Sequence, residues 1–163
     1  MIQTLDRQLV DSLIAEAKQS PRRRMNHNYH QSFEENPHRF LNVMLRGSYF
    51  TPHRHLKPPK HESFLVLQGE VGFVAFDETG QVTNTYRLTP EGLIGNSDAV
   101  MGIDIPPGVW HCLVVISEVA VCYEVKPGPY DPNSDKEFAD WAPHEGSKGT
   151  EAYTRFLLGL FDR

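Results

Sequence analysis

The N-terminal residues follow the spacing of an amphipathic helix. Their apolar positions recur about every fourth residue, and two more residues widen the stripe: Leu5, Leu9, Leu13 and Ala17, then Val10 and Ile14. We therefore expect a helix over residues 4–18, with Thr4 placed to be its N-cap. A shorter helix is expected at about residues 150–160, with Thr150 as its cap, from the apolar positions Tyr153, Phe156, Leu157 and Leu160.

From about residue 40 to residue 125 the chain changes to short apolar runs separated by turn residues. The runs predict strands at residues 39–46, 48–55, 62–68, 70–76, 84–88, 100–105, 109–116 and 119–126. Many short strands with Gly and Pro between them are typical of a sandwich or barrel. The predicted fold is therefore all-β, a jelly-roll barrel with one helix near its N-terminus and one near its C-terminus. The polar segment from Ser20 to Pro37 predicts no clear element.

A length of 163 residues is that of one compact domain. We expect a single domain over residues 1–163, in three parts: an N-terminal helix in 1–20, a barrel core in 39–126, and a C-terminal extension with its helix in 127–163. The net charge of −5 argues against a nucleic-acid partner, which usually meets a basic face. Because the chain lacks a signal-peptide pattern and an apolar run long enough to span a bilayer, we expect a cytoplasmic protein without a membrane partner.

The two cysteines fit that compartment, because a disulfide scaffold would need more of them. Alternation directs Cys112 away from the face that His111 occupies. The position of Cys122 depends on the turn around residues 117–118. A three-residue turn would set the two cysteines opposite each other, and a two-residue turn would set them on different faces. We predict free, buried thiols.

Most of the candidate metal ligands lie in residues 47–69, GSYFTPHRHLKPPKHESFLVLQG. His53 and His55 are two residues apart, a spacing that puts both side chains on one face of a strand. Glu62 opens the next apolar run, and a hairpin between the two strands would set it opposite the histidines. Two imidazoles and a carboxylate on facing strands are a ligand set for Fe, Mn, Ni, Co or Zn.

A fourth ligand is available in the run GIDIPPGVWHCLVV. His111 follows a Pro-Pro-Gly turn and enters an apolar strand, so its imidazole is placed to point into the barrel mouth. A single histidine is more often a structural residue than a ligand, and we expect that for the others: His27, His30, His38, His61 and His144. Separate structural roles are a weaker explanation for His53, His55, Glu62 and His111. The same-face pair, the following carboxylate and the turn-anchored histidine would then all have to occur together by chance.

These spacings resemble the two motifs of the cupins. The first motif is matched by Gly47, His53, His55, Glu62 and Gly69, and the second by PPGVWH at residues 106–111. Two departures are visible. The six residues between His55 and Glu62 are more than the common pattern has, which makes His61 the next candidate ligand, and Val115 stands where the second motif usually has asparagine. Glu62 is preferred because its distance to Gly69 matches the motif.

The resemblance extends to GPYDPNSDKEFADWAPHEG, FDETGQV and SPRRRMNHNYH, which are similar to segments of the WbuC family of small cupin metalloproteins. That family is found among bacterial O-antigen and surface-polysaccharide genes, and the similarity covers about Pro21 to Leu157. It implies a cupin double-stranded β-helix with one bound divalent transition metal, but it supplies no reaction. By analogy with cupins whose barrel edge is covered by a second subunit, it also implies a homodimer.

Alternation along the predicted strands indicates the pocket walls. Tyr49 and Thr51 share the parity of the histidine pair, and Gln68 shares that of Glu62, so these three are the expected polar contacts. Arg54 and Trp110 should face away from the metal. In the N-terminal segment we expect Arg24 or His30 to contact an anionic group of a small-molecule ligand, with plain surface solvation as the alternative.

The residues leave more than one function open. One is a metal-dependent enzyme, an isomerase or oxygenase, acting on a small sugar-derived or other oxygen-rich metabolite, because three His and one Glu leave open positions on an octahedral metal. Another is a non-catalytic metallocupin that binds a small ligand as a sensor or accessory protein. These two share every residue named above. A metal-free nucleotide-sugar epimerase on the same fold is disfavoured by the intact ligand set.

Overall fold

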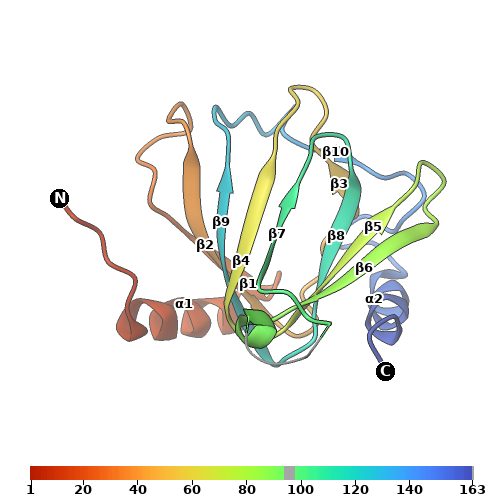
Figure 1. Ribbon diagram of the computed structural model, residues 1–163, viewed down its shortest axis with the longest axis horizontal. Helices are drawn as coiled ribbons and strands as arrows, with labels where there is room; N and C mark the ends of the chain where they lie inside the picture. Colours follow the sequence, from red (N-terminus) through yellow and green to blue (C-terminus); the bar gives the residue numbers. More distant parts are fainter. Residues whose placement is uncertain (94–97, 163) are drawn as a thin grey trace.

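The computed structural model describes residues 1–93 and 98–162, and its strands form two five-stranded antiparallel sheets that face each other (Figure 1). The first sheet contains, in spatial order, β1 (Arg24–Asn28), β2 (His38–Leu45), β9 (Val119–Lys126), β4 (Glu62–Gln68) and β7 (Gly102–Ile105). The second contains β10 (Glu137–Phe138), β3 (His53–Arg54), β8 (Trp110–Val115), β5 (Val71–Phe76) and β6 (Val82–Leu88). The helices are α1 (Arg7–Gln19), α2 (Thr150–Gly159) and a 3-10 helix at Pro90–Leu93. The predicted jelly roll with a helix near each end is confirmed.

Alternate side chains of the central strands divide between the barrel interior and an outer layer. The interior cluster takes residues from both sheets, among them Met44, Phe64, Val66, Phe73, Leu113, Val115 and Cys122. The intervening residues of β2 and β9 pack against Leu13 and Ala17 of α1. Those of β5 and β8 pack against Leu157 of α2. Because both faces of these strands are covered, their sequences are continuous apolar runs and do not alternate between apolar and polar residues.

Both helices begin with a different cap from the one predicted. The N-cap of α1 is Asp6 rather than Thr4, and its carboxylate accepts a hydrogen bond from the Leu9 backbone N–H over 2.9 Å. The N-cap of α2 is Gly149, at a φ of 97° that favours glycine, so the predicted cap at Thr150 is also wrong. In residues 1–93 and 98–162, no helix combines the length and the apolarity that crossing a membrane requires.

Two stretches differ from the predicted strands. Residues 48–55 form only the two-residue strand β3, because the chain before it leaves the sheet to pack beneath the C-terminal extension. The polar segment 20–37 contributes β1, which pairs with β2 from Arg24 to Asn28. At the end of β4 the register with β9 shifts between Val66 and Gln68, a bulge that ends the alternation begun at Glu62.

Connections between the two sheets replace the hairpins expected around the site. Strand β3 lies in the second sheet and β4 in the first, so the predicted hairpin is wrong and Glu62 faces the histidines across the barrel. Strands β8 and β9 also belong to different sheets, and neither turn considered for the cysteines applies. Cys112 lies in the outer layer near α2 and Cys122 in the interior, both as buried free thiols.

The cap of α1 gives a direct test of its helix start. Replacing Asp6 with alanine removes the acceptor of the Leu9 N–H and should lower the free energy of unfolding by about 1 kcal/mol. Urea denaturation of Asp6→Ala measures this, with Thr4→Ala as the matched control that should change little. An equal loss in the two variants would contradict the assignment of the cap.

Candidate metal centre

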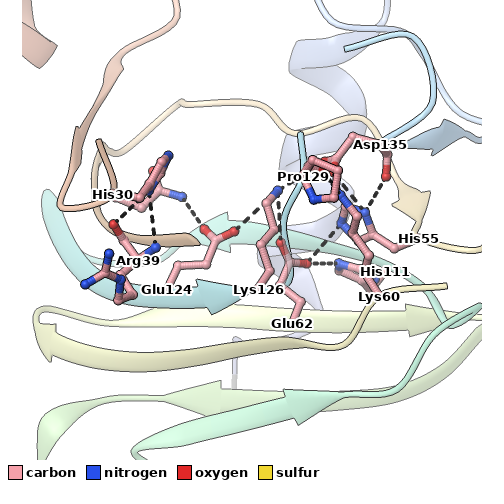
Figure 2. Close-up of polar contacts among 11 residues, drawn as sticks. His30, Arg39, His55, Lys60, Glu62, His111, Glu124, Lys126, Pro129 and Asp135 are labelled. Atoms are coloured by element: carbon pink, nitrogen blue, oxygen red, sulfur yellow. Dashed lines mark hydrogen bonds and ion pairs between the residues drawn. The ribbon is translucent and has the colours of Figure 1, made fainter. Parts of the chain in front are cut away.

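The candidate ligands meet inside the barrel near the first residues of β4 and β8. His53 of β3 pairs in register with His111 of β8, and His55 follows β3 directly. Glu62 is the first residue of β4 in the facing sheet. All four side chains are buried. Figure 2 shows the Glu62 carboxylate directed at the imidazoles of His55 and His111.

Each of the three imidazoles is oriented by a hydrogen bond between its Nδ1 and a backbone carbonyl. The pairs are His53 with Thr51 at 3.0 Å, His111 with Val109 at 2.9 Å, and His55 with Asp135. A carbonyl oxygen only accepts, so the ring proton resides on Nδ1 in each case. Every Nε2 of a neutral ring is then left with a lone pair, which is the arrangement that backbone anchoring gives to metal-binding histidines.

These Nε2 atoms converge on the Glu62 carboxylate. Those of His55 and His111 lie 3.4 Å and 3.1 Å from Glu62 Oε2. One ligating atom from each of His53, His55 and Glu62 lies within 4.8 Å of the others, and the His111 ring is centred 4.6 Å from that of His53. Lone pairs that face an anionic oxygen need a cation, either a proton or a metal ion, to hold them together.

The residues present fit a divalent metal. Among the described residues, the buried Nε2 atoms of His53 and His55 have no hydrogen-bond partner. Imidazole and carboxylate together suit first-row transition metals. The alternative ligand His61 is exposed, with its Nδ1 3.8 Å from Asp104, and so lies outside this group.

A lysine compensates the negative charge of Glu62. The Lys126 ammonium lies 3.1 Å from Asp135 Oδ2 and 3.9 Å from an oxygen of both Glu62 and Glu124 (Figure 2). Burial by itself raises the pKa of Glu62, but its close contacts with the imidazoles of His111 and His55 and the charge of Lys126 hold that pKa well below its usual range. The Glu62 carboxylate is therefore ionised and ready to bind a cation.

The pKa of Glu124 is shifted in the opposite direction from that of Glu62. Burial and the nearby charge of Glu62 raise the pKa of Glu124 well above its usual value, although Lys126 opposes this. Two carboxyls in one pocket thus differ in protonation, since the field of the ionised one favours the neutral form of the other.

The charged residues around the ligands are those that sequence reasoning missed. Glu124 and Lys126 could have been found, because they continue the inward parity of Ala120 and Cys122 along a strand that was predicted correctly. Asp135 and Lys136 lie in an irregular segment before β10, where no periodicity marks which side chains turn inward. Lys60 belongs to the basic loop between His55 and Glu62, yet its ammonium is buried and pairs with Asp135 at 2.7 Å.

The three polar side chains predicted to line the pocket, Tyr49, Thr51 and Gln68, lie elsewhere in the structure. The Tyr49 hydroxyl donates to the Pro143 carbonyl at 2.5 Å and lies under the C-terminal extension, away from the histidines. Thr51 accepts a hydrogen bond from the Glu145 backbone N–H at 2.8 Å, and only its carbonyl reaches the site, through His53. Gln68 follows the β-bulge and is exposed. The structure does not bring these three side chains into the pocket, because the strand parity on which they depended does not continue that far.

The two residues expected to meet an anion also differ from each other. His30 is buried, and its ring stacks on that of His38 with the centres 4.0 Å apart. Its Nδ1 is within hydrogen-bond distance of the backbone N–H and carbonyl of Arg39. Arg24 lines a cavity beside the candidate ligands, but its guanidinium is held by Glu145 at 2.8 Å and lies over the Phe50 ring. Arg54 and Trp110 face outward as predicted, with the guanidinium 4.3 Å from the indole.

Two cavities adjoin the candidate ligands. The smaller, of about 30 Å³, is lined by His53, Glu62 and His111. The larger, of about 570 Å³, opens between β1, β2 and the segment before β10. Four residues line both cavities: Asn42, Phe50, Glu124 and Lys136. A small molecule in the larger cavity would therefore be next to the candidate ligands.

Comparison with known proteins identifies the fold. A family model described as a domain of unknown function, DUF6016, matches residues 5–88. No curated protein matches the chain. The capsular polysaccharide assembling protein CapF from Staphylococcus aureus is similar over 69% of this chain and 28% of that chain, with 20% identity and a TM-score of 0.55. This chain thus spans less than a third of the length of CapF.

A second solved structure is similar over nearly its whole length. It is an uncharacterized conserved protein with a double-stranded β-helix domain from Klebsiella pneumoniae, with 16% identity and a TM-score of 0.56 over 86% of this chain and 99% of that chain. Such identities establish the fold alone, and that fold is the cupin double-stranded β-helix.

The raised pKa of Glu124 predicts a pH dependence of stability. A carboxyl whose folded-state pKa lies above its unfolded value of about 4.3 stabilises the fold below that pH and loses this contribution as the pH rises toward the folded value. Glu124→Gln is neutral at every pH, so its stability relative to the unmodified protein should increase as the pH rises above about 4.3. Urea denaturation across a pH series with chelator present measures this, with exposed Glu151→Gln as control; a pH-independent difference would contradict it.

Proposed function

The chain belongs to the DUF6016 family, a domain of unknown function, and we propose that it is a metal-binding cupin that uses one divalent transition metal to act on a small, oxygen-rich metabolite. The observation that carries the proposal is the convergence of backbone-anchored imidazoles on a buried, ionised carboxylate. His53, His55, Glu62 and His111 would hold the metal. When bound, the metal would supply Lewis-acid polarisation of a substrate oxygen.

The residues of the chain supply the rest of the site. The carbonyls of Thr51, Val109 and Asp135 fix the three rings, so that the ligands are arranged before a metal arrives. Asn42 donates toward the Glu124 carboxyl over 3.4 Å, and its own buried Oδ1 has no partner among the described residues. That oxygen is available to a hydroxyl group of a substrate. Phe64 and Leu113 line the smaller cavity and make part of its wall apolar.

We further propose that the metabolite is sugar-derived and belongs to surface-polysaccharide metabolism. The support is the motif resemblance to the WbuC metalloproteins, which covers most of the chain. CapF, which is described as a capsular polysaccharide assembling protein, shares the fold.

Metal analysis tests the proposal. Protein purified without chelator should contain about one Fe, Mn, Ni, Co or Zn per chain by mass spectrometry of the metals. His53→Ala or Glu62→Gln should remove most of it, because each substitution deletes a converging donor. His61→Ala is the matched control, since His61 is exposed and outside the group. Unmodified protein that remains metal-free when each of these ions is supplied would refute the proposal. Turnover of sugar-derived metabolites by the loaded protein separates an enzyme from a protein that only binds.

We also propose that the protein is a homodimer. Strand β6 ends the second sheet, and only the end of its outer edge is paired, where the Arg87 carbonyl accepts a hydrogen bond from the Val100 N–H among the described residues. Its central residues are exposed, so that part of the edge is available to a second copy. Light scattering on a size-exclusion column should give twice the mass of one chain, and the mass of a single chain would contradict the proposal.

A further inference from the structure

Lys136 stands where the two cavities meet. It lines both the larger cavity of about 570 Å³ and the smaller one of about 30 Å³ that reaches His53, Glu62 and His111. Its side chain is half-buried, in the irregular segment that precedes β10. A molecule that enters the larger cavity and approaches the candidate ligands would therefore meet the Lys136 side chain.

The other cations around this space already have anionic partners. Lys60 and Lys126 lie 2.7 Å and 3.1 Å from the two oxygens of Asp135. The guanidinium groups at the outer end of the cavity both bind Glu145, from Arg22 at 2.9 Å and from Arg24 at 2.8 Å.

Arg24 has further acceptors in the Tyr49 carbonyl and the Ser48 hydroxyl. An anion would have to displace these protein contacts in order to bind it. Lys136, by contrast, makes no ion pair or hydrogen bond with any residue in the described parts of the chain.

The balance of charge in the interior favours an anionic ligand. Lysines 60, 126 and 136 face the carboxylates of Glu62 and Asp135 and the neutral carboxyl of Glu124, so three potential positive charges stand against two negative ones. Burial and the ammonium of Lys126 lower the pKa of Lys136 even though these carboxylates oppose the shift. A divalent metal would add two positive charges to this group. Buried charge without compensation is costly, so negative charge from outside the chain would stabilise the site.

Building on the function proposed above, we infer that Lys136 is the specificity residue of this site and binds the carboxylate or phosphate group of a polyhydroxylated, sugar-like acid. A lysine ammonium is a compact charge that binds either anion. The remaining lining suits the neutral part of such a ligand: Asn26, Asn28 and Asn42 offer amides to hydroxyl groups, and Phe33, Phe40 and Tyr130 offer ring faces to C–H groups. The ligand would thus place its anionic group at Lys136, next to the candidate ligands, and its hydroxylated part in the larger cavity.

Calorimetric titration of metal-loaded protein with three probes tests this inference. Glucose 6-phosphate and glucuronate carry the two candidate anionic groups, and glucose is the matched neutral probe. At least one acid should bind ten-fold or more tightly than glucose. Lys136→Met should weaken binding of that acid by about 10- to 100-fold, as expected for loss of a charge-assisted hydrogen bond, and should leave glucose unchanged. Lys136→Arg should retain most of the preference, and Lys148→Met, on the exposed surface, should have no effect.

Stability and metal content show whether Lys136 has only a structural role. The removal of a half-buried ammonium without a protein partner should leave the thermal unfolding midpoint of Lys136→Met unchanged or raised, with metal content equal to that of the unmodified protein. Equal binding of acids and glucose, or an acid preference that survives in Lys136→Met, would overturn the inference. A loss of metal or of stability in Lys136→Met would overturn it too, because Lys136 would then be part of the fold.

The experiments distinguish a failure of this inference from a failure of the proposed metal site. Metal content is measured on the unmodified protein, so a metal-loaded chain that does not prefer acids refutes the anion site alone. A chain that never binds metal but binds acids through Lys136 refutes the metal proposal alone.

Discussion

A carboxylate buried between two sheets is the constraint on which the rest of this structure depends. Glu62 is 2% exposed, and an ionised carboxylate in a protein interior is tolerated only when it is paired and hydrogen-bonded. The compensation comes from two directions. Lys126 lies on a neighbouring strand of the same sheet, and His55 and His111 approach from the other sheet. The two sheets are joined here by charge, whereas elsewhere they are joined by apolar packing.

The same requirement explains why the chain outside the barrel core closes over this end. Asp135 orients His55 through its carbonyl and pairs through its carboxylate with Lys60 and Lys126. Asp135 belongs to the C-terminal extension, and Lys60 belongs to the long loop between His55 and Glu62. Their ion pair therefore holds the extension and the loop together beside the candidate ligands. That loop is the part that departs from the common cupin spacing, and its Lys60 turns inward instead of facing a ligand. The proposed anion contact lies at Lys136, which the sequence did not indicate.

Prediction succeeded where a pattern is local and failed where it crosses from one sheet to the other. The outward position of Trp110 follows from the inward position of its neighbour His111, because β8 is regular over its whole length. Tyr49 and Gln68 were assigned by the same rule and are misplaced, since β3 has only two residues and β4 ends in a bulge. The predicted hairpin between β3 and β4 was wrong because sequence neighbours in a jelly roll often belong to opposite sheets.

The sequence by itself determined the jelly-roll class and the identity of the four residues that meet in the barrel, because apolar periodicity and short-range ligand spacing are local properties of a chain. It also placed the two α-helices near the ends of the chain, although it misplaced their caps. Only the tertiary structure decided that Glu62 faces its histidines across the barrel and which charges surround it. Glu124, Lys126, Asp135 and Lys136 come from a distant strand and an irregular segment, and the protonation of buried groups depends on all their neighbours together. Their roles follow from distances in space, which the order of residues along the chain does not contain.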